Sequence, residues 1–368
     1  MKLNILQSEL SAQIQKAAGF VSKTSQLPVL ENIVLETEKN RLNIKATNLE
    51  ISFFSSIGAK VAQSGKIAVP AKEFAEILKN TSAENLELEV ESESLKIKSD
   101  SVNIELSGMN TSDFPEISQS VSSKAVGLPS EQLKQVLSEV LFSVSRDETR
   151  PILTGVLFVF DSQLGKLTFV SSDGFRLSKK QIDVEGQFED SQVVVPRSVL
   201  SELIHNVDEG EVLFEYSLSD NEVRFGFGKN VLGSRLVEGQ FPDFNKIIPK
   251  TSSVEASFEK DEFRRLVKMA SIFAKDSANI VYIKVEENSV SVVAESSRSG
   301  SQEGSLPAKV EGDPITIAFN WRFLDEYLGI VQGEEVKLIL NSTTSPGVFK
   351  DPKNPDLLHL IMPVRLQD

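Results

Sequence analysis

The sequence predicts an α+β fold made of three tandem copies of one unit, each with two helices packed on antiparallel sheets. Three observations predict this fold. A helical pattern of apolar residues recurs every 123 to 130 residues, a short strand followed by a second helix recurs every 124 to 126 residues, and runs of alternating polar and apolar residues lie between them. A chain of 368 residues is also too long for a single hydrophobic core.

The first helix of each unit is predicted by an apolar stripe. In the second unit the stripe starts at Leu133 and continues at the third, fourth, seventh and eighth positions after it, as one face of an α-helix does. Ser130 is the expected N-cap of this helix. Equivalent stripes start at Leu10, 123 residues earlier, and at Phe263, 130 residues later. The same helix is therefore expected three times.

The segment after this helix repeats as well. In the second unit a polar turn, residues 145–150, leads into a β-branched run that is predicted to be a strand from Ile152. The matching segments of the first two units start at Pro28 and Pro151, which are 123 residues apart. The repeat thus keeps both the spacing and the residue type.

A second helix follows a short strand in every unit. The strands end at Pro70, Pro196 and Asn320, with spacings of 126 and 124 residues. Both prolines stand where a helix tolerates proline, in its first turn. The same period therefore runs through the whole chain.

Alternating runs at residues 86–97, 212–227 and 280–293 predict antiparallel strands, roughly eight in each unit. Residues 118–127 are polar and serine-rich, and residues 250–253 are also typical of a linker. We therefore expect domains at residues 1–120, 127–248 and 249–368.

Composition and charge exclude several classes of protein. The chain has no cysteine, which excludes disulfides and thiolate sites, and it has no apolar leader or membrane-spanning run, so we expect a cytoplasmic protein. The net charge is −14, yet the formal charges of the six helical windows sum to zero. The acidic excess therefore lies in strands, loops and linkers. If the helices share one surface, that surface is suited to weak, sequence-independent contact with phosphates, although an ordinary solvated surface remains an alternative.

Three motifs in this order carry a resemblance that covers the full chain. They are SSDGFRL at residues 171–177, EGQFPDF at 238–244 and LIMPVRL at 360–366. With them the chain resembles the family of bacterial DNA polymerase III sliding clamps, the β subunits. The resemblance implies three copies of a DNA-clamp unit, closing as a head-to-tail dimeric ring with helices inside and sheets outside. It also implies a processivity factor that encloses double-stranded DNA without reading its sequence and tethers the replicative polymerase.

In that family, the polymerase, the clamp loader and other replication and repair proteins dock by a short peptide in a cleft between the second and third domains. In this chain Phe175 and Lys246 stand where the family commonly has histidine and arginine, and Arg176 and Arg365 are expected to hold peptide oxygens. The cleft residues implied by the match are Leu153, Ser172, Gly174, Phe175, Arg176, Leu177, Pro242, Lys246, Ile247, Phe323, Leu360, Ile361, Met362, Pro363, Val364 and Arg365.

The resemblance also implies a DNA-facing set and a dimer seam. The expected DNA-facing residues are Lys16, Lys23, Thr24, Lys72, Lys79, Lys134, Arg146, Arg150, Arg197, Arg264 and Lys268. The seam is expected to bring Ile104 and Leu106 of one copy against Ile272 and Phe273 of the other.

Nothing in the sequence favours an enzyme. The two histidines, His205 and His359, are not in a metal-ligand spacing, and nucleophile and Walker A motifs are missing. We therefore expect no catalytic residue, no metal, no cofactor and no membrane partner. The alternative is a metal-dependent phosphoesterase or nuclease that uses Asp147, Glu148 and Asp173.

Overall fold

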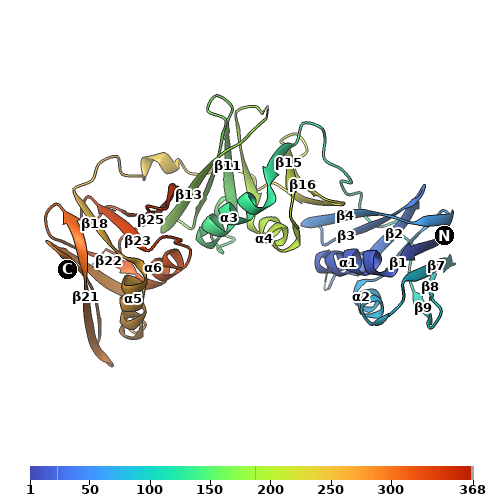
Figure 1. Cartoon of the computed structure of the whole chain (residues 1–368), viewed down its shortest axis with the longest axis horizontal. Helices are drawn as coiled ribbons and strands as arrows, with labels where there is room; N and C mark the ends of the chain where they lie inside the picture. The colour runs from blue at the N-terminus through green and yellow to red at the C-terminus, as the bar shows by residue number, and fades with distance from the viewer. Residues whose placement is uncertain (23, 187, 366–368) are drawn as a thin grey trace. The chain divides into compact units, whose positions relative to one another are not determined.

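The computed structural model describes residues 1–22, 24–186 and 188–365. Its first repeat contains β1 (Lys2–Leu6), α1 (Gln7–Ala17), the 3-10 turns Ala18–Phe20 and Pro28–Glu31, β2 (Asn32–Glu38), β3 (Arg41–Thr47), β4 (Ile51–Gly58), β5 (Lys60–Gln63), β6 (Lys66–Pro70), α2 (Ala71–Asn80), β7 (Asn85–Glu91), β8 (Ser94–Lys98) and β9 (Asn103–Ser107) (Figure 1).

The second repeat contains β10 (Val126–Pro129), α3 (Ser130–Val140), the 3-10 turns Leu141–Ser143 and Pro151–Leu153, β11 (Gly155–Asp161), β12 (Lys166–Ser172), β13 (Arg176–Asp183), β14 (Ser191–Pro196), α4 (Arg197–Asn206), β15 (Glu211–Ser217), β16 (Glu222–Phe227) and β17 (Asn230–Arg235).

The 3-10 turn Phe244–Lys246 precedes the third repeat, which contains β18 (Val254–Glu259), α5 (Lys260–Ala274), β19 (Ile280–Glu286), β20 (Ser289–Ser296), β21 (Gly300–Glu311), β22 (Ile315–Asn320), α6 (Trp321–Leu328), β23 (Glu335–Leu340), β24 (Gly347–Asp351) and β25 (Asn354–Ile361).

The described chain confirms two helices per repeat and antiparallel pairing of the strands. The repeats have nine, eight and eight strands among the described residues, because the first repeat adds the short edge strand β5. The expected strand start at Ile152 is wrong. Leu153 and Thr154 donate backbone hydrogen bonds to Arg150 and Pro151 three residues back, at 3.0 and 2.9 Å, so these residues form a tight turn and the strand starts at Gly155.

The position of the two prolines also differs from the expectation. Pro70 and Pro196 are the last residues of β6 and β14, immediately before the helices rather than within their first turn. Pro70 has φ −53° and ψ 118°, which is extended backbone, and it is the N-cap residue of α2. Each proline therefore ends a strand and lets the helix begin at the next residue.

The chain forms two compact units. One comprises Met1–Leu133, Glu185–Phe188 and Ser198–Leu236, and the other comprises Lys134–Val184, Glu189–Arg197 and Val237–Asp368. The boundary passes through the second repeat because its strands divide between two sheets. The first unit contains the eight-stranded sheet β10-β15-β16-β17-β4-β3-β2-β6 and a five-stranded sheet β5-β1-β7-β8-β9, and the second unit contains a twelve-stranded sheet from β14 to β22.

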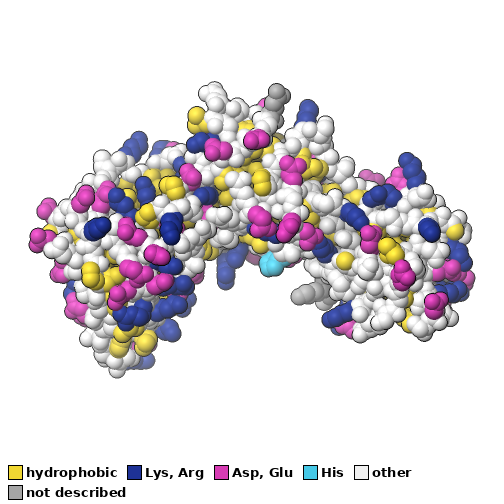
Figure 2. All heavy atoms as spheres, in the orientation of Figure 1, with side chains coloured by type: hydrophobic (Ala, Val, Ile, Leu, Met, Phe, Trp, Pro, Cys, Tyr) yellow, Lys and Arg dark blue, Asp and Glu magenta, His cyan; other side chains and the backbone are white. Residues whose placement is uncertain are grey.

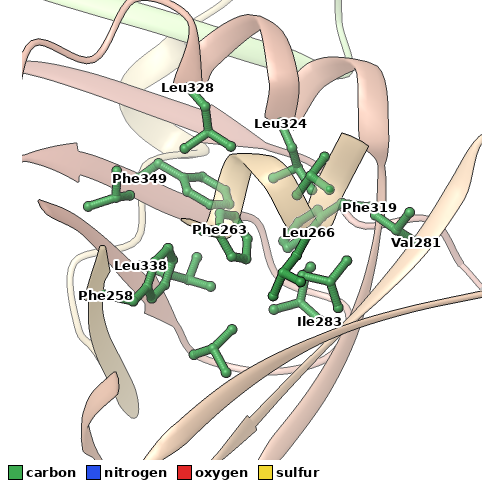
Figure 3. Close-up of a cluster of buried hydrophobic side chains, with 14 of the residues drawn as sticks. Phe258, Phe263, Leu266, Val281, Ile283, Phe319, Leu324, Leu328, Leu338 and Phe349 are labelled. Atoms are coloured by element: carbon green, nitrogen blue, oxygen red, sulfur yellow. The ribbon is translucent and has the colours of Figure 1, made fainter. Parts of the chain in front are cut away.

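The core of the third repeat shows how the predicted stripe works. Phe263 and Leu266 on α5 pack against Phe319 and Leu324, with Ile283 of β19 beside them (Figure 3). Phe263, Phe319 and Leu324 are fully buried, and burial of such a side chain stabilises the fold by roughly 1.5–3 kcal/mol. The helix stripe therefore faces its own repeat's sheets, as its spacing predicts.

Strands β13 and β25 join the second and third repeats within one sheet. Arg176 pairs with Ile361, and Leu177 pairs with Leu360. A buried polar group lies beside this join, where the Glu139 carboxylate accepts hydrogen bonds from Asn354 at 2.8 Å and Gln135 at 2.9 Å. The register of β13 and β25 brings the motifs at residues 171–177 and 360–366 side by side.

In the described part of the chain, no helix has the length and apolar character needed to cross a membrane.

Candidate functional site

The turn between β12 and β13, residues 172–176, is held by its own side chains. The Asp173 carboxylate accepts hydrogen bonds from the backbone N–H groups of Phe175 and Arg176, at 2.8 and 3.0 Å. The Ser172 hydroxyl donates to the Arg176 carbonyl at 2.7 Å and accepts from the Gly174 N–H at 3.0 Å. The turn is therefore rigid, and it fixes where Phe175 projects.

Gly174 is required at the tip of this turn. Its φ of +91° is a conformation that L side chains rarely adopt. A Cβ atom at this position would lie 2.7 Å from the Arg150 guanidinium. The backbone conformation thus favours glycine, and a larger residue would also displace the flexible Arg150 side chain.

The carboxyl-terminal strand continues along this turn. The Met362 N–H donates to the Phe175 carbonyl at 2.8 Å, and the Val364 N–H donates to the Ala318 carbonyl of β22 at 2.8 Å. Residues 362–364 are half-buried, and Arg365 is exposed. The terminal motif therefore lies between the 172–176 turn and the third repeat.

An apolar cluster, which we call the tail cluster, lies under these segments. Its buried members are Leu157, Val170, Leu177, Val194 and Leu360, and its half-buried members are Ile152, Val159, Val237, Phe241, Phe244, Ile248, Leu358 and Met362. The half-buried side chains leave apolar surface accessible to solvent around the buried members of the cluster.

The Arg176 guanidinium is bonded within the protein. It donates to the Asp173 carboxylate at 3.0 Å, to the Glu326 carboxylate at 2.5 Å and to the Phe142 carbonyl at 2.7 Å. It also lies over the rings of Phe142 and Phe323, 5.3 and 4.6 Å from their centroids. With only 8% of its side chain exposed, Arg176 links β13 to α6 through bonds within the protein, and its role toward a peptide oxygen stays a prediction.

Behind Arg176 lies a stack of buried rings. His359 is parallel to Tyr327 at a centroid distance of 4.8 Å, and its Nδ1 is 2.8 Å from the Ser178 hydroxyl. Complete burial and the nearby Arg176 charge hold the pKa of His359 well below its ordinary value, while burial raises the pKa of Tyr327. The imidazole therefore stays neutral in the folded protein.

The other predicted cleft residues fall into two groups. Leu153, Leu177, Leu360 and Ile361 are buried, and Ile361 belongs to the third-repeat core. Phe175, Pro242, Lys246, Ile247 and Arg365 are exposed, with Phe175 59% and Ile247 42% accessible. The buried group shapes the base, and the exposed group is available to a ligand.

Sequence reasoning missed several contributors. Phe241 and Phe244 belong to the tail cluster, although they stand in the FPDF motif that carried the resemblance. Phe142 and Glu326, which bind Arg176, stand in helix or turn segments with no motif. Of these residues, only Phe241 and Phe244 could have been predicted from the sequence, because they stand in a recognised motif.

The predicted DNA-facing residues lie on helices and on the turns beside them. Lys72 and Lys79 of α2, Lys268 of α5, Thr24, Arg146 and Arg150 are exposed, whereas Lys16, Lys134, Arg197 and Arg264 are half-buried. Lys23 lies outside the described residues. Dark blue lysine and arginine side chains gather around α5, with yellow apolar side chains near them (Figure 2).

Several of these cations have partners within the protein. Lys16 is 2.9 Å from the Asp208 carboxylate, and Arg264 is 2.8 Å from Asp325. Burial, with the Arg146 charge nearby, lowers the pKa of Arg197.

The predicted seam residues lie on an edge strand and on a helix. Ile104 and Leu106 are half-buried on β9, the last strand of its sheet among the described residues. Ile272 of α5 is 63% exposed, whereas Phe273 is half-buried and packs against the third-repeat core. Ile272 therefore presents more free apolar surface than Phe273.

The carboxylates of the hydrolase alternative are used in turns. Asp147 accepts hydrogen bonds from Thr149, which lower its pKa, and it also pairs with Arg150 at 3.2 Å. Asp173 holds the turn described above. Within the described ranges no group of three or more His, Asp or Glu residues is placed to hold a metal ion. The hydrolase alternative has no support.

Comparisons with known proteins agree along the whole chain. Family models described as the N-terminal, central and C-terminal domains of the DNA polymerase III beta subunit match residues 1–118, 127–243 and 245–365. A beta sliding clamp of Chlamydia pneumoniae is 31% identical over 373 residues and covers all of both chains.

Solved structures give the same result. A DNA polymerase III subunit beta from Pseudomonas aeruginosa and a DNA polymerase sliding clamp from Bacillus subtilis each have a TM-score of 0.93, 25% identity and full coverage of both chains. Domain models, sequence relatives and structural neighbours therefore agree with the motifs and the repeat. The chain belongs to the family of DNA polymerase III beta subunits, the beta sliding clamps.

Proposed function

We propose that this protein is a DNA polymerase processivity factor. Two copies close head to tail into a ring around duplex DNA, and the ring tethers the polymerase by a short peptide that binds at the tail cluster. The ring slides without chemistry of its own, so we assign no catalytic residue, and we infer a cytoplasmic location with DNA. Three domains, at residues 1–120, 127–248 and 249–368, supply the repeated parts.

Two free strand edges carry this proposal. β9 ends its sheet, and within the described residues it pairs with β8 alone. Residues 300–307 of β21 pair with β20, whereas β18 pairs only with residues 308–311, so the other edge of residues 300–307 has no strand partner in the described part of the chain. Free edges present unpaired N–H and C=O groups that a second strand can satisfy. We propose that β9 of one copy pairs with β21 of the next, because each copy offers one edge of each kind.

Apolar side chains beside these edges support the same contact. Ile104 and Leu106 lie on β9, and the exposed Ile272 lies on α5 of the third repeat. An obligate interface buries apolar side chains together with its hydrogen bonds. Ile272 is therefore the strongest candidate for the seam on the α5 side.

The DNA contact that fits this chain is sequence-independent. The exposed Lys72, Lys79, Lys268 and Arg146 stand on helices or the turns beside them, while the net charge of the chain is −14. Scattered cations neutralise phosphates weakly and without reading bases. Such a surface suits an enclosed duplex that must slide rather than stay at one site.

The tail cluster supports the peptide site. Phe175 and Ile247 are exposed beside half-buried Phe241, Phe244 and Met362. Exposed Lys246 and Arg365 are cationic groups in the same predicted set. A peptide with large apolar anchors and an acidic residue or carboxylate would fit this composition, since Met and aromatic side chains adapt to apolar ligands.

The direct test of assembly is the mass in solution, measured by light scattering across a dilution series. We expect a dimer of about twice the 40.5 kDa of one chain, and dissociation at high dilution if the seam is reversible. A monomer at every concentration would contradict the ring.

A further inference from the structure

The first repeat builds a second copy of the 172–176 turn. The side-chain oxygen Oδ1 of Asn48 accepts hydrogen bonds from the backbone N–H groups of Glu50 and Ile51, at 3.0 and 2.8 Å. The Thr47 hydroxyl donates to the Ile51 carbonyl at 2.9 Å and accepts from the Leu49 N–H at 3.0 Å. These bonds match those of Asp173 and Ser172 one for one, so Leu49 takes the place of Gly174.

The strand that runs beside this turn is matched as well. Ser234 of β17 pairs with Ile51, as Ile361 of β25 pairs with Arg176. A groove of about 220 Å³ lies here, within the first compact unit. This volume is below the range of small-molecule pockets and is suited to one or two side chains of a bound segment.

The groove has apolar parts. Ile51, Pro115 and Ile117 line it, and Leu49 stands at its edge with 58% of its surface exposed. Leu49 has a φ of +75°, which is uncommon for a leucine. A large apolar side chain is thus presented to solvent at the position where the matching turn needs glycine.

The groove carries more acidic than basic side chains. Glu50, Glu116 and Asp220 line it and are exposed, whereas Arg235 is the exposed cation among its lining residues. A fourth lining carboxylate, Glu222, is paired with Arg224 at 2.7 Å. The exposed carboxylates outnumber the exposed cation, so a basic ligand would complement the charge of the groove.

We propose that this groove is a second docking site, which takes a short partner segment with a large apolar side chain next to lysine or arginine. Its apolar edge at Leu49 contacts the apolar side chain, and Glu50, Glu116 and Asp220 pair with the basic ones. The predicted peptide residues at the tail cluster include two exposed cations, Lys246 and Arg365, of which Lys246 is paired with Asp243 at 3.4 Å. We therefore expect the groove to prefer a more basic segment than the tail cluster does.

The test uses the full-length protein and a fluorescein-labelled ten-residue probe peptide that contains two leucines and three lysines, followed by fluorescence anisotropy. The first variant is Leu49→Gly, which removes the apolar side chain at a φ that glycine adopts freely, so the fold is retained. The second is Glu50→Lys with Glu116→Lys. The control is Glu84→Lys with Glu93→Lys, which changes the charge equally at exposed positions that do not line the groove.

We expect Leu49→Gly to weaken probe binding about fivefold, the groove double variant to weaken it about tenfold or more, and the control to change it by less than about twofold. Equal weakening by the control would mean attraction to the general acidic surface and would overturn the proposal. Unchanged binding by Leu49→Gly, or no binding of the probe to the wild type, would overturn it as well. A Phe175→Asp variant should bind the probe like the wild type, and loss of binding there would move the site to the tail cluster.

Discussion

Arg176 is almost completely buried, yet it links several parts of the candidate site. Its side chain is only 8% exposed, and it contacts Asp173, Glu326, Phe142 and Phe323 from two repeats. The sequence places Arg176 in a motif, yet it cannot say whether a guanidinium faces a ligand or the protein. That distinction depends on Phe142 and Glu326, which are 34 and 150 residues away in the chain.

Replacement of this arginine tests its role as a link. Arg176→Lys keeps the charge but loses the planar fork and the ring contacts, so we expect the free energy of unfolding to fall by about 1–3 kcal/mol and the affinity for a polymerase-derived clamp peptide to fall with it. Arg365→Lys, at an exposed position, is the control and should leave stability unchanged. If Arg176→Lys lowered peptide affinity without any loss of stability, Arg176 would be a direct ligand contact instead.

His359 makes stability depend on pH. Its pKa is lowered in the folded protein by burial, while in the unfolded chain it is about 6.5. Below about pH 6.5 the His359 imidazole is therefore protonated in the unfolded state but stays neutral in the folded state. The contribution of His359 to the free energy of unfolding is complete above about pH 6.5, and it is lost as the pH falls, at up to about 1.4 kcal/mol per pH unit.

We expect denaturant unfolding to show this loss between pH 6.5 and 5.5 for the wild type, and His359→Phe, which keeps the ring stack on Tyr327, to lose about 1 kcal/mol less. His205→Gln is the matched control, because the chain has two histidines, and it should behave as the wild type does. An equal pH dependence in His359→Phe would exclude the buried imidazole as the cause.

At the scale of elements, the proposed seam has one strongly exposed apolar side chain on α5, Ile272, whereas its neighbour Phe273 packs against the core. Ile272→Asp should convert the dimer to folded monomers in light scattering, because the charge would be buried against the apolar edge of the next copy. Leu164→Asp is a close control, since Leu164 is 64% exposed in a turn and Ile272 is 63% exposed. A dimer that withstands Ile272→Asp would remove α5 from the interface.

The carboxyl-terminal segment has a buried part, and we propose that the more exposed residues after it bind the peptide. Leu360 and Ile361 are completely buried, so their removal would open the core, whereas residues 362–365 are half-buried or exposed. Truncation after Ile361 should therefore abolish binding of the polymerase-derived peptide and leave the dimer mass unchanged. Binding that survives the truncation would restrict the peptide site to the 172–176 turn and the FPDF segment.

Elements with a clear period were predictable, and turns were not. The stripes from Leu10, Leu133 and Phe263 predict α1, α3 and α5 because each helix buries one face on its own repeat. The apolar run from Ile152 predicts a strand, whereas residues 151–153 form a 3-10 turn whose geometry depends on hydrogen bonds back to Arg150 and Pro151. Strand propensity is a property of single residues, whereas the conformation of this turn is set by its hydrogen bonds to neighbouring residues.

For the whole molecule, the repeat was the most informative feature of the sequence, but it does not define the compact units. Strand β17 pairs with β4 and strand β13 pairs with β25, so each half of the second repeat extends a sheet of a neighbour. Alternation predicts that strands exist, whereas the partner of an edge strand is set by contacts far away in the sequence. The exposed Leu49 groove and the Arg176 link both lie at these joins.

Enclosure is the central claim, and retention on DNA of different topology tests it most directly. The protein is loaded on nicked circular DNA by a clamp loader, one half of the sample is linearised with a restriction enzyme, and protein that stays with the DNA is counted after gel filtration in 0.5 M salt, where simple phosphate contacts are weak. A sliding ring stays on the circle and runs off the linear ends. Equal retention on both forms, or loss from both, would contradict the ring and would mean ordinary surface binding.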